Sequence, residues 1–306
     1  MGLVMHWYDF VCVGIVGVSV VGAIVVLIRN EGRRIKARDR INEGGMMAER
    51  SYESLLVPTL EEPVEGFVSS MSLWISCWRC VHPALLAIYR FLAFIIMLLL
   101  LIWDIEDWTL GIYAYYTEWT FTLVIIYFGL ATIISAKGCS QLAKKDNTRD
   151  QDVRANFLKM DPEQGAHVTE RSGKNLDGGL VKLKNHQELE EQKKRAGFWG
   201  YAMQIIFQTC AGAVMMTDIV FWLVIVPFLS SERFALNLLM GSMHTVNALL
   251  LLIDASLNSM NFPWFRGAYF VLWTALYVIF QWIIHACGMT WWPYPFLELS
   301  TPWAPL

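Results

Sequence analysis

Six long apolar runs, separated by polar segments, dominate the hydropathy pattern of the chain. Runs of ~18 residues or more are long enough for an α-helix to cross the ~30 Å hydrocarbon core of a bilayer. In lipid the backbone must satisfy its own hydrogen bonds, and a single helix does so. The sequence therefore predicts an all-α, polytopic transmembrane helix bundle of about six spans. The predicted spans are residues 10–28, 84–103, 119–136, 198–226, 237–255 and 264–287.

The polar segments between these runs predict the domain organisation. Residues 1–28 are expected to form a short outer N-terminus and the first transmembrane helix, and residues 29–82 a cytosolic loop. Residues 83–306 are expected to form a five-helix membrane core, which a second, charged cytosolic loop at 137–197 interrupts. The first loop is polar, contains Gly44, Gly45, Pro58 and Pro63, and is expected to be partly disordered. The Gly, Asn, Lys and Glu content of the second is typical of disordered or loosely helical chain.

Basic residues set the predicted orientation. The first loop holds 8 Lys and Arg between Arg29 and Arg79, and the second holds 13 between Lys137 and Arg195, so 8 + 13 = 21 of the 24 lie in these two loops. The positive-inside rule places such loops in the cytosol. Both termini are then expected outside. The net charge of −3 carries no basic surplus, so a nucleic-acid partner is not expected.

Composition supports the membrane assignment. The chain is 56% hydrophobic and contains 14 Trp, which suits aromatic belts at the two membrane interfaces. The 6 Cys are scattered, so no disulfide framework is expected. Cys77 and Cys80 have CxxC spacing without a second such pair, which favours ordinary interfacial cysteines, with palmitoylation as the alternative. We expect neither a metal nor a cofactor.

Polar residues inside the apolar runs are the candidates for chemistry. His244 lies ~10 Å below the outer start of the fifth predicted span, at 1.5 Å per residue. Ionisable groups at membrane depth usually face a bundle interior or a wet cavity, and histidine can act as acid or base near neutral pH. Thr117 lies at the outer mouth of the third span, and Asp218 and His285 lie toward the outer ends of the fourth and sixth. Four polar groups therefore converge in the outer half.

A threonine hydroxyl is a weak nucleophile that needs an adjacent base, and histidine is the usual one. Thr117 with His244 would suit acyl transfer from a lipid ester to water, with Asp218 as the partner of His244. The alternatives are structural: Thr117 bonded to a nearby backbone carbonyl, and His285 an interfacial histidine without a role. Asp254 lies ~15 Å from His244 along the helix and is expected to anchor or cap.

Several stretches resemble a known family. TEWTFTLVIIYFGL, GSMHTVNALLLLID, FPWFRGAYFVLW, QWIIHACGM and WWPYPFLEL are similar to the rolling stone-like multi-pass membrane proteins. They resemble more distantly the androgen-induced, FAR-17a-type membrane hydrolases. The resemblance covers roughly residues 105–305 outside the long loop.

The resemblance implies a catalytic pair. The hydrolases cleave fatty acid esters of hydroxy fatty acids with a threonine and a histidine, which correspond here to Thr117 and to His244 in a G-x-M-H-T motif. Their W-x-x-H motif matches Trp282 and His285. Glu118 replaces an apolar residue of the hydrolases, and the hydrolases are expected to continue into another span.

Three functions remain open from the sequence. The first is an intramembrane lipid-ester hydrolase with Thr117 as nucleophile and His244 as base. The second is a non-enzymatic membrane scaffold of the rolling stone type, whose two loops would bind partners. The third is a lipid-binding or transport protein that uses the same polar cavity. All three predict an integral membrane protein in contact with lipid, in the endoplasmic reticulum or the plasma membrane.

Overall fold

The computed structural model describes residues 7–48, 67–78, 80–158, 195–228, 238–294 and 297–298. Their helices are α1 (Trp7–Ala48), α2 (Pro83–Trp108), α3 (Tyr116–Leu158), α5 (Phe198–Val220), α6 (Val226–Phe228), α7 (Leu238–Leu257) and α8 (Gly267–Ala286). A π-helical turn, Phe221–Ile225, joins α5 to α6. Six of the helical stretches are long and apolar enough to cross a membrane. Within the described ranges no strand forms, so the predicted all-α bundle is confirmed.

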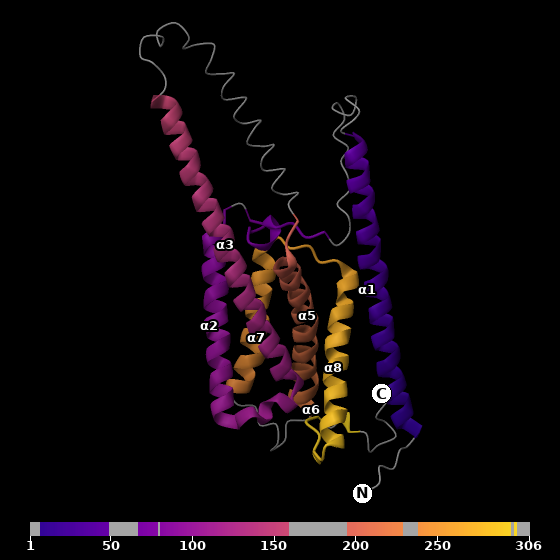
Figure 1. Cartoon of the computed structure of the whole chain (residues 1–306). Helices are drawn as coiled ribbons and strands as arrows, with labels where there is room; N and C mark the ends of the chain where they lie inside the picture. The colour runs from indigo at the N-terminus through magenta and orange to yellow at the C-terminus, as the bar shows by residue number, and fades with distance from the viewer. Residues whose placement is uncertain are drawn as a thin grey trace.

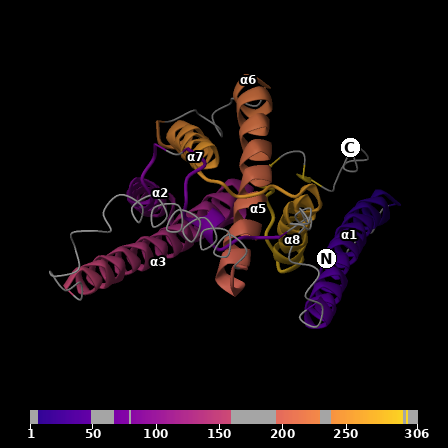
Figure 2. The same cartoon turned by 90° about the horizontal axis from the view of Figure 1, so that it is seen from above.

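The helices run alternately up and down around α5, which packs against α3, α7 and α8. Helix α2 packs against α3 and α7, while α1 lies at the edge of the bundle against α8 (Figures 1 and 2). One end carries the start of α1, the end of α2, and the starts of α3 and α7 (Figure 1). We call it the outer end, after the predicted orientation, and the opposite end the inner end.

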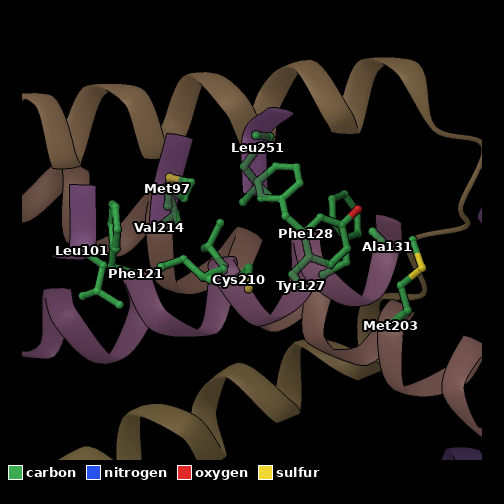
Figure 3. Close-up of a cluster of buried hydrophobic side chains, with 14 of the residues drawn as sticks. Met97, Leu101, Phe121, Tyr127, Phe128, Ala131, Met203, Cys210, Val214 and Leu251 are labelled. Carbon is green, nitrogen blue, oxygen red and sulfur yellow. The ribbon is translucent and has the colours of Figure 1, made fainter. Parts of the chain in front are cut away.

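The core lies between α2, α3, α5 and α7. Its side chains include Met97, Leu101, Phe121, Phe128 and Leu251, and they interdigitate along the length of the bundle (Figure 3). In lipid, helices associate through close packing and interhelical hydrogen bonds, because the surrounding solvent is itself apolar. The apolar side chains that point away from this core, such as those of α1, are those that a bilayer would cover.

The inner end is held by a buried arginine. Snorkelling of Arg90 to the cytosolic interface, which its position near the end of a span suggests, does not occur. Its side chain is fully buried, with Nε 2.8 Å from Asp254 Oδ1 and Nη1 2.7 Å from both Leu73 O and Ser135 Oγ. The Tyr127 hydroxyl also donates to Asp254. Because each nitrogen of its guanidinium has a partner inside the protein, Arg90 gains little from reaching water. Asp254 is an anchor, as expected.

The end of the first predicted loop is also ordered, which corrects the expectation of loose polar chain there. Residues 67–78 lie across the inner end and include the 3₁₀ turn Met71–Leu73. Ser76 Oγ donates to Leu257 O at 2.7 Å, and Ser259 Oγ donates to Ile75 O at 2.9 Å. The Leu73 side chain is buried, and the segment therefore closes the inner end.

Several helices run past the expected ends of the spans. Helix α1 continues to Ala48 and α3 to Leu158, so the first part of each predicted cytosolic loop is helical (Figure 1). Helix α2 includes the acidic residues Asp104, Glu106 and Asp107, which follow the predicted span 84–103 and would mark an acidic outer turn. Charge ends a membrane span, but it does not end a helix, because charged residues are good or neutral helix formers in water.

Arg266 attaches α1 to the rest of the bundle. Its fully buried guanidinium lies 3.2 Å from Glu31 Oε1 on α1 and also donates to Gln204 Oε1 on α5. The Gln204 amide in turn donates to Asn261 O at 2.5 Å. Two arginine clusters, around Arg90 and Arg266, therefore tie five helices together at the inner end.

Candidate functional site

His244 and Asp218 pair in the outer half of the bundle. Nδ1 of His244, on α7, lies 2.9 Å from Asp218 Oδ1, on α5. The carboxylate accepts, so Nδ1 carries the proton, and in the neutral imidazole Nε2 has the free lone pair. Among the described residues this is the hydrogen bond that His244 makes, although the residue is only 5% exposed. The pairing expected from the depths of the two residues is present.

Phe221 fixes the plane of the imidazole. Its ring stacks on His244 with centroids 3.8 Å apart and an interplanar angle of 9°. Phe221 begins the π-helical turn, three residues after Asp218. Pro227 has no N–H to donate to the residue-223 carbonyl and would collide with it in a regular helix, so the wider turn relieves that conflict. Such π-turns are frequent at functional sites, and this one places the Phe221 ring against His244.

Thr117 occupies the second position of α3, at the outer end, and is half-buried. The hydroxyl of Tyr294 lies within hydrogen-bonding reach of its side chain. Burial raises the pKa of Tyr294 to about 12, so its phenol is neutral at physiological pH and either hydroxyl can donate. The structural alternative for Thr117 was a hydrogen bond to a nearby backbone carbonyl. Tyr294, from the segment after α8, is a second possible partner for its hydroxyl.

A cluster of buried side chains connects the surroundings of Thr117 to those of His244. It contains Tyr116 and Tyr294 beside the threonine, Phe221 beside the histidine, and Ala213 and Tyr277 between them. Within the described residues Thr117 and His244 do not hydrogen-bond to each other. The cavity that we expect them to share stays a prediction, and so do the catalytic roles of both.

His285 is engaged elsewhere. Its Nδ1 lies 2.7 Å from Gln281 O, and its Nε2 lies 3.0 Å from Trp291 O. The ring also stacks on Trp292, with centroids 3.5 Å apart. The residue lies at the outer end of α8 as expected, but both nitrogens face carbonyl oxygens, and its contacts hold the segment that follows α8.

Two buried carboxyl groups were missed by the sequence reasoning. Asp104, near the end of α2, and Glu118, at the start of α3, are each 7% exposed. Within the described residues, one carboxyl oxygen of each is buried without a hydrogen-bond partner. The signal in the sequence was the unusual glutamate next to Thr117. The sequence pattern places Asp104 in an acidic outer turn, without a sign that it is buried.

Among the described residues, no group of three or more His, Cys, Asp or Glu side chains is placed to hold a metal ion. Comparisons with protein-family models, with curated proteins and with solved structures give no match to this chain. The fold and the spans therefore define its class, a multi-pass helical membrane protein, and the site must be argued from its own geometry.

Proposed function

We propose that this chain is an intramembrane hydrolase of lipid esters, with Thr117 as nucleophile and His244 as general base. The observation that carries the proposal is the buried Asp218–His244 pair, with Nδ1 held by the carboxylate at 2.9 Å and Nε2 left without a partner among the described residues. A histidine oriented in this way by a carboxylate is the base of many acyl-transfer enzymes. The resemblance to the androgen-induced membrane hydrolases selects the same histidine.

The chemistry follows from the hydrogen bond. Nε2 would take the proton of the Thr117 hydroxyl as Oγ1 attacks the ester carbonyl, and Asp218 would stabilise the imidazolium that forms. The imidazolium then protonates the departing alcohol, which leaves an acyl-threonine. Water, deprotonated by the same Nε2, releases the fatty acid and restores the threonine. A position in the outer half of the bundle gives such a site access to both lipid and water.

The shared cluster supports a direct meeting of the two groups. Tyr116 precedes Thr117, Phe221 stacks on His244, and both aromatic rings pack into one set of side chains. Helix α3 also packs against both α5 and α7, which carry the pair. Catalytic contacts are often long in an empty site and shorten when substrate binds. The proposal therefore requires the start of α3 to move toward α7, so that the Thr117 hydroxyl reaches His244.

The test is covalent labelling of the purified protein with a fluorophosphonate probe, which reacts with activated hydroxyl nucleophiles. The wild type should be labelled, and Thr117→Ala should not. His244→Ala should reduce the labelling rate by about 10²–10⁴-fold, the usual contribution of a general base. Thr122→Ala is the matched control, because Thr122 lies on the same helix and bonds Tyr113 at 3.2 Å. Labelling that persists in Thr117→Ala would exclude this nucleophile.

A second proposal, a membrane scaffold, has its own observation. Helices α1 and α3 continue well beyond the spans, to Ala48 and Leu158, on the same side of the bundle (Figure 1). Projecting helices of this kind suit partner binding. A wild type that gives no labelling at all, while its inner-side helices retain a partner in pull-down, would favour this function over hydrolysis.

A further inference from the structure

The chain reverses direction directly after α8. Gly288 N–H donates to His285 O, and Met289 N–H donates to Ile284 O, both at 3.1 Å, which is the hydrogen-bond pattern of a Schellman motif. Gly288 has φ +113°, a conformation that residues with a side chain rarely adopt. This glycine therefore sends the following residues back across the outer end of the bundle.

Residues 291–294, which we call the strap, lie against the start of α3. The Tyr115 ring packs against Trp291, with centroids 6.1 Å apart, and edge-on against Tyr294, at 5.7 Å. His285 holds the other side of the strap through Trp291 O and the stacked Trp292 ring. A few aromatic contacts and one hydrogen bond to a side chain thus hold the strap to the outer ends of α3 and α8.

The strap covers the proposed nucleophile. Tyr294 is 8% exposed and packs in one buried cluster with Tyr116, the residue before Thr117, and its hydroxyl lies near Thr117. An ester carbonyl approaching Oγ1 of Thr117 must displace that phenol or pass beside it. Trp291, by contrast, is 48% exposed, so little of its side chain is packed against the bundle.

We propose that the strap is a gate over Thr117, which pivots at Gly288 and opens to admit a lipid ester. The inference rests on the proposed function only for the role given to Thr117. The gating itself is a property of the fold. Closure keeps the threonine hydroxyl bonded to Tyr294, and opening frees it for His244 at the moment when a substrate arrives.

Accessibility of position 117 tests the gate without any hydrolysis. In a background with Cys77, Cys80 and Cys287 replaced by Ser, Thr117→Cys is reacted in detergent with a small methanethiosulfonate, and the rate is followed by mass spectrometry. Gly288→Ala and Trp291→Ala each weaken the closed strap. Each should raise the rate by about tenfold, the change expected when a contact of ~1.4 kcal/mol is lost.

Two control variants carry the same substitutions, Gly to Ala and Trp to Ala, at positions outside the strap and its pivot. A Cβ on Gly111 meets nothing within 4 Å, as at Gly288, but Gly111 has no positive φ, so Gly111→Ala should leave the rate unchanged. Trp108 is 63% exposed at the end of α2, so Trp108→Ala should also change nothing. Thermal midpoints of all variants in detergent identify any that are misfolded.

Two results would overturn the gate. One is an equal rate in the strap variants, the controls and the parent. The other is a parent in which the introduced thiol already reacts as fast as free glutathione. Failure of the proposed function looks different: if the wild type gives no fluorophosphonate labelling but the strap variants accelerate thiol modification, the gate stands and the nucleophile role of Thr117 falls.

Discussion

Arg90 and His244 are both buried ionisable side chains within membrane spans, but their surroundings differ. Arg90 has acceptors for its donors from Asp254, Ser135 and the Leu73 carbonyl. His244 has Asp218 at one nitrogen and no partner among the described residues at the other. The Arg90 guanidinium and its partners stabilise the structure together, because each satisfies the hydrogen bonds of the others. A histidine with one nitrogen unpaired can still exchange a proton. The first is structural, and the second is the candidate for chemistry.

The Arg90 cluster gives a stability prediction. Arg90→Met leaves Asp254 buried without its cation and should destabilise the bundle by about 3–5 kcal/mol, the usual cost of breaking a buried pair. Arg195→Met is the control, since Arg195 is exposed and its side chain donates to the Tyr201 hydroxyl at 3.0 Å; its cost should stay within about 0.5 kcal/mol. Reversible unfolding in mixed detergent micelles measures both. Equal losses in the two variants would contradict a structural role for the cluster.

The sequence predicted the pairing of Asp218 with His244, because both residues lie at similar depth on helices expected to be adjacent in the chain. It did not predict the partners of Arg90, because one of them is a backbone carbonyl of residues 67–78, and composition alone marks that segment as loop. It also missed Phe221 and Tyr294 as neighbours of the site. An aromatic residue in an apolar run carries no signal that distinguishes a stacking partner from a lipid-facing ring.

At the scale of the elements, glycines decide how closely segments approach. A Cβ on Gly138 of α3 would lie 2.3 Å from the Trp74 ring, and one on Gly212 of α5 would lie 2.8 Å from the Phe270 ring. Small residues at such contacts let membrane helices and loops pack tightly. The sequence predicted the presence of the helices better than their ends. Hydropathy marks the residues that lie in the hydrocarbon core, and a helix can continue beyond them into water.

Gly138→Ala should loosen the segment at residues 67–78. The added methyl would collide with Trp74, a buried ring that cannot move away freely, so the expected loss is about 1–3 kcal/mol, as for overpacking of a core. Gly14→Ala is matched to it, since a Cβ there meets nothing within 4 Å, and it should be neutral or stabilising by about 0.5–1 kcal/mol through helix propensity. Thermal unfolding followed by tryptophan fluorescence compares the two variants. A Gly138→Ala midpoint at or above that of Gly14→Ala would show that the contact is unimportant.

At the scale of the whole molecule, the six spans and their alternating directions followed from hydropathy and agree with the structure. The orientation in the membrane rests on the bias of basic residues, 21 of 24, toward the two inner segments. Glu106 lies near the end of α2, and Lys144 is the last residue of the apolar stretch of α3, at its inner end. The two positions therefore report on opposite sides of a membrane.

Labelling with a membrane-impermeant maleimide checks the orientation. In sealed membranes whose accessible face is the outer one, Glu106→Cys should react and Lys144→Cys should react only after the membrane is opened. The parent for both variants has Cys77, Cys80 and Cys287 replaced by Ser, because these native thiols are exposed at the two ends. The reverse pattern would invert the orientation and would place the Asp218–His244 pair on the cytosolic side.

The two arginine clusters at the inner end have a mechanical consequence. They pin the helices at one end, so the movement left to α3, α7 and α8 is a tilt about that end. A helix of 20 residues is ~30 Å long. If it is fixed at one end, a tilt of about 5° displaces the other end by about 2.6 Å. That displacement is close to the diameter of a water molecule. A pivot at the inner end, where the two arginine clusters lie, would therefore set the width of the opening at the outer end.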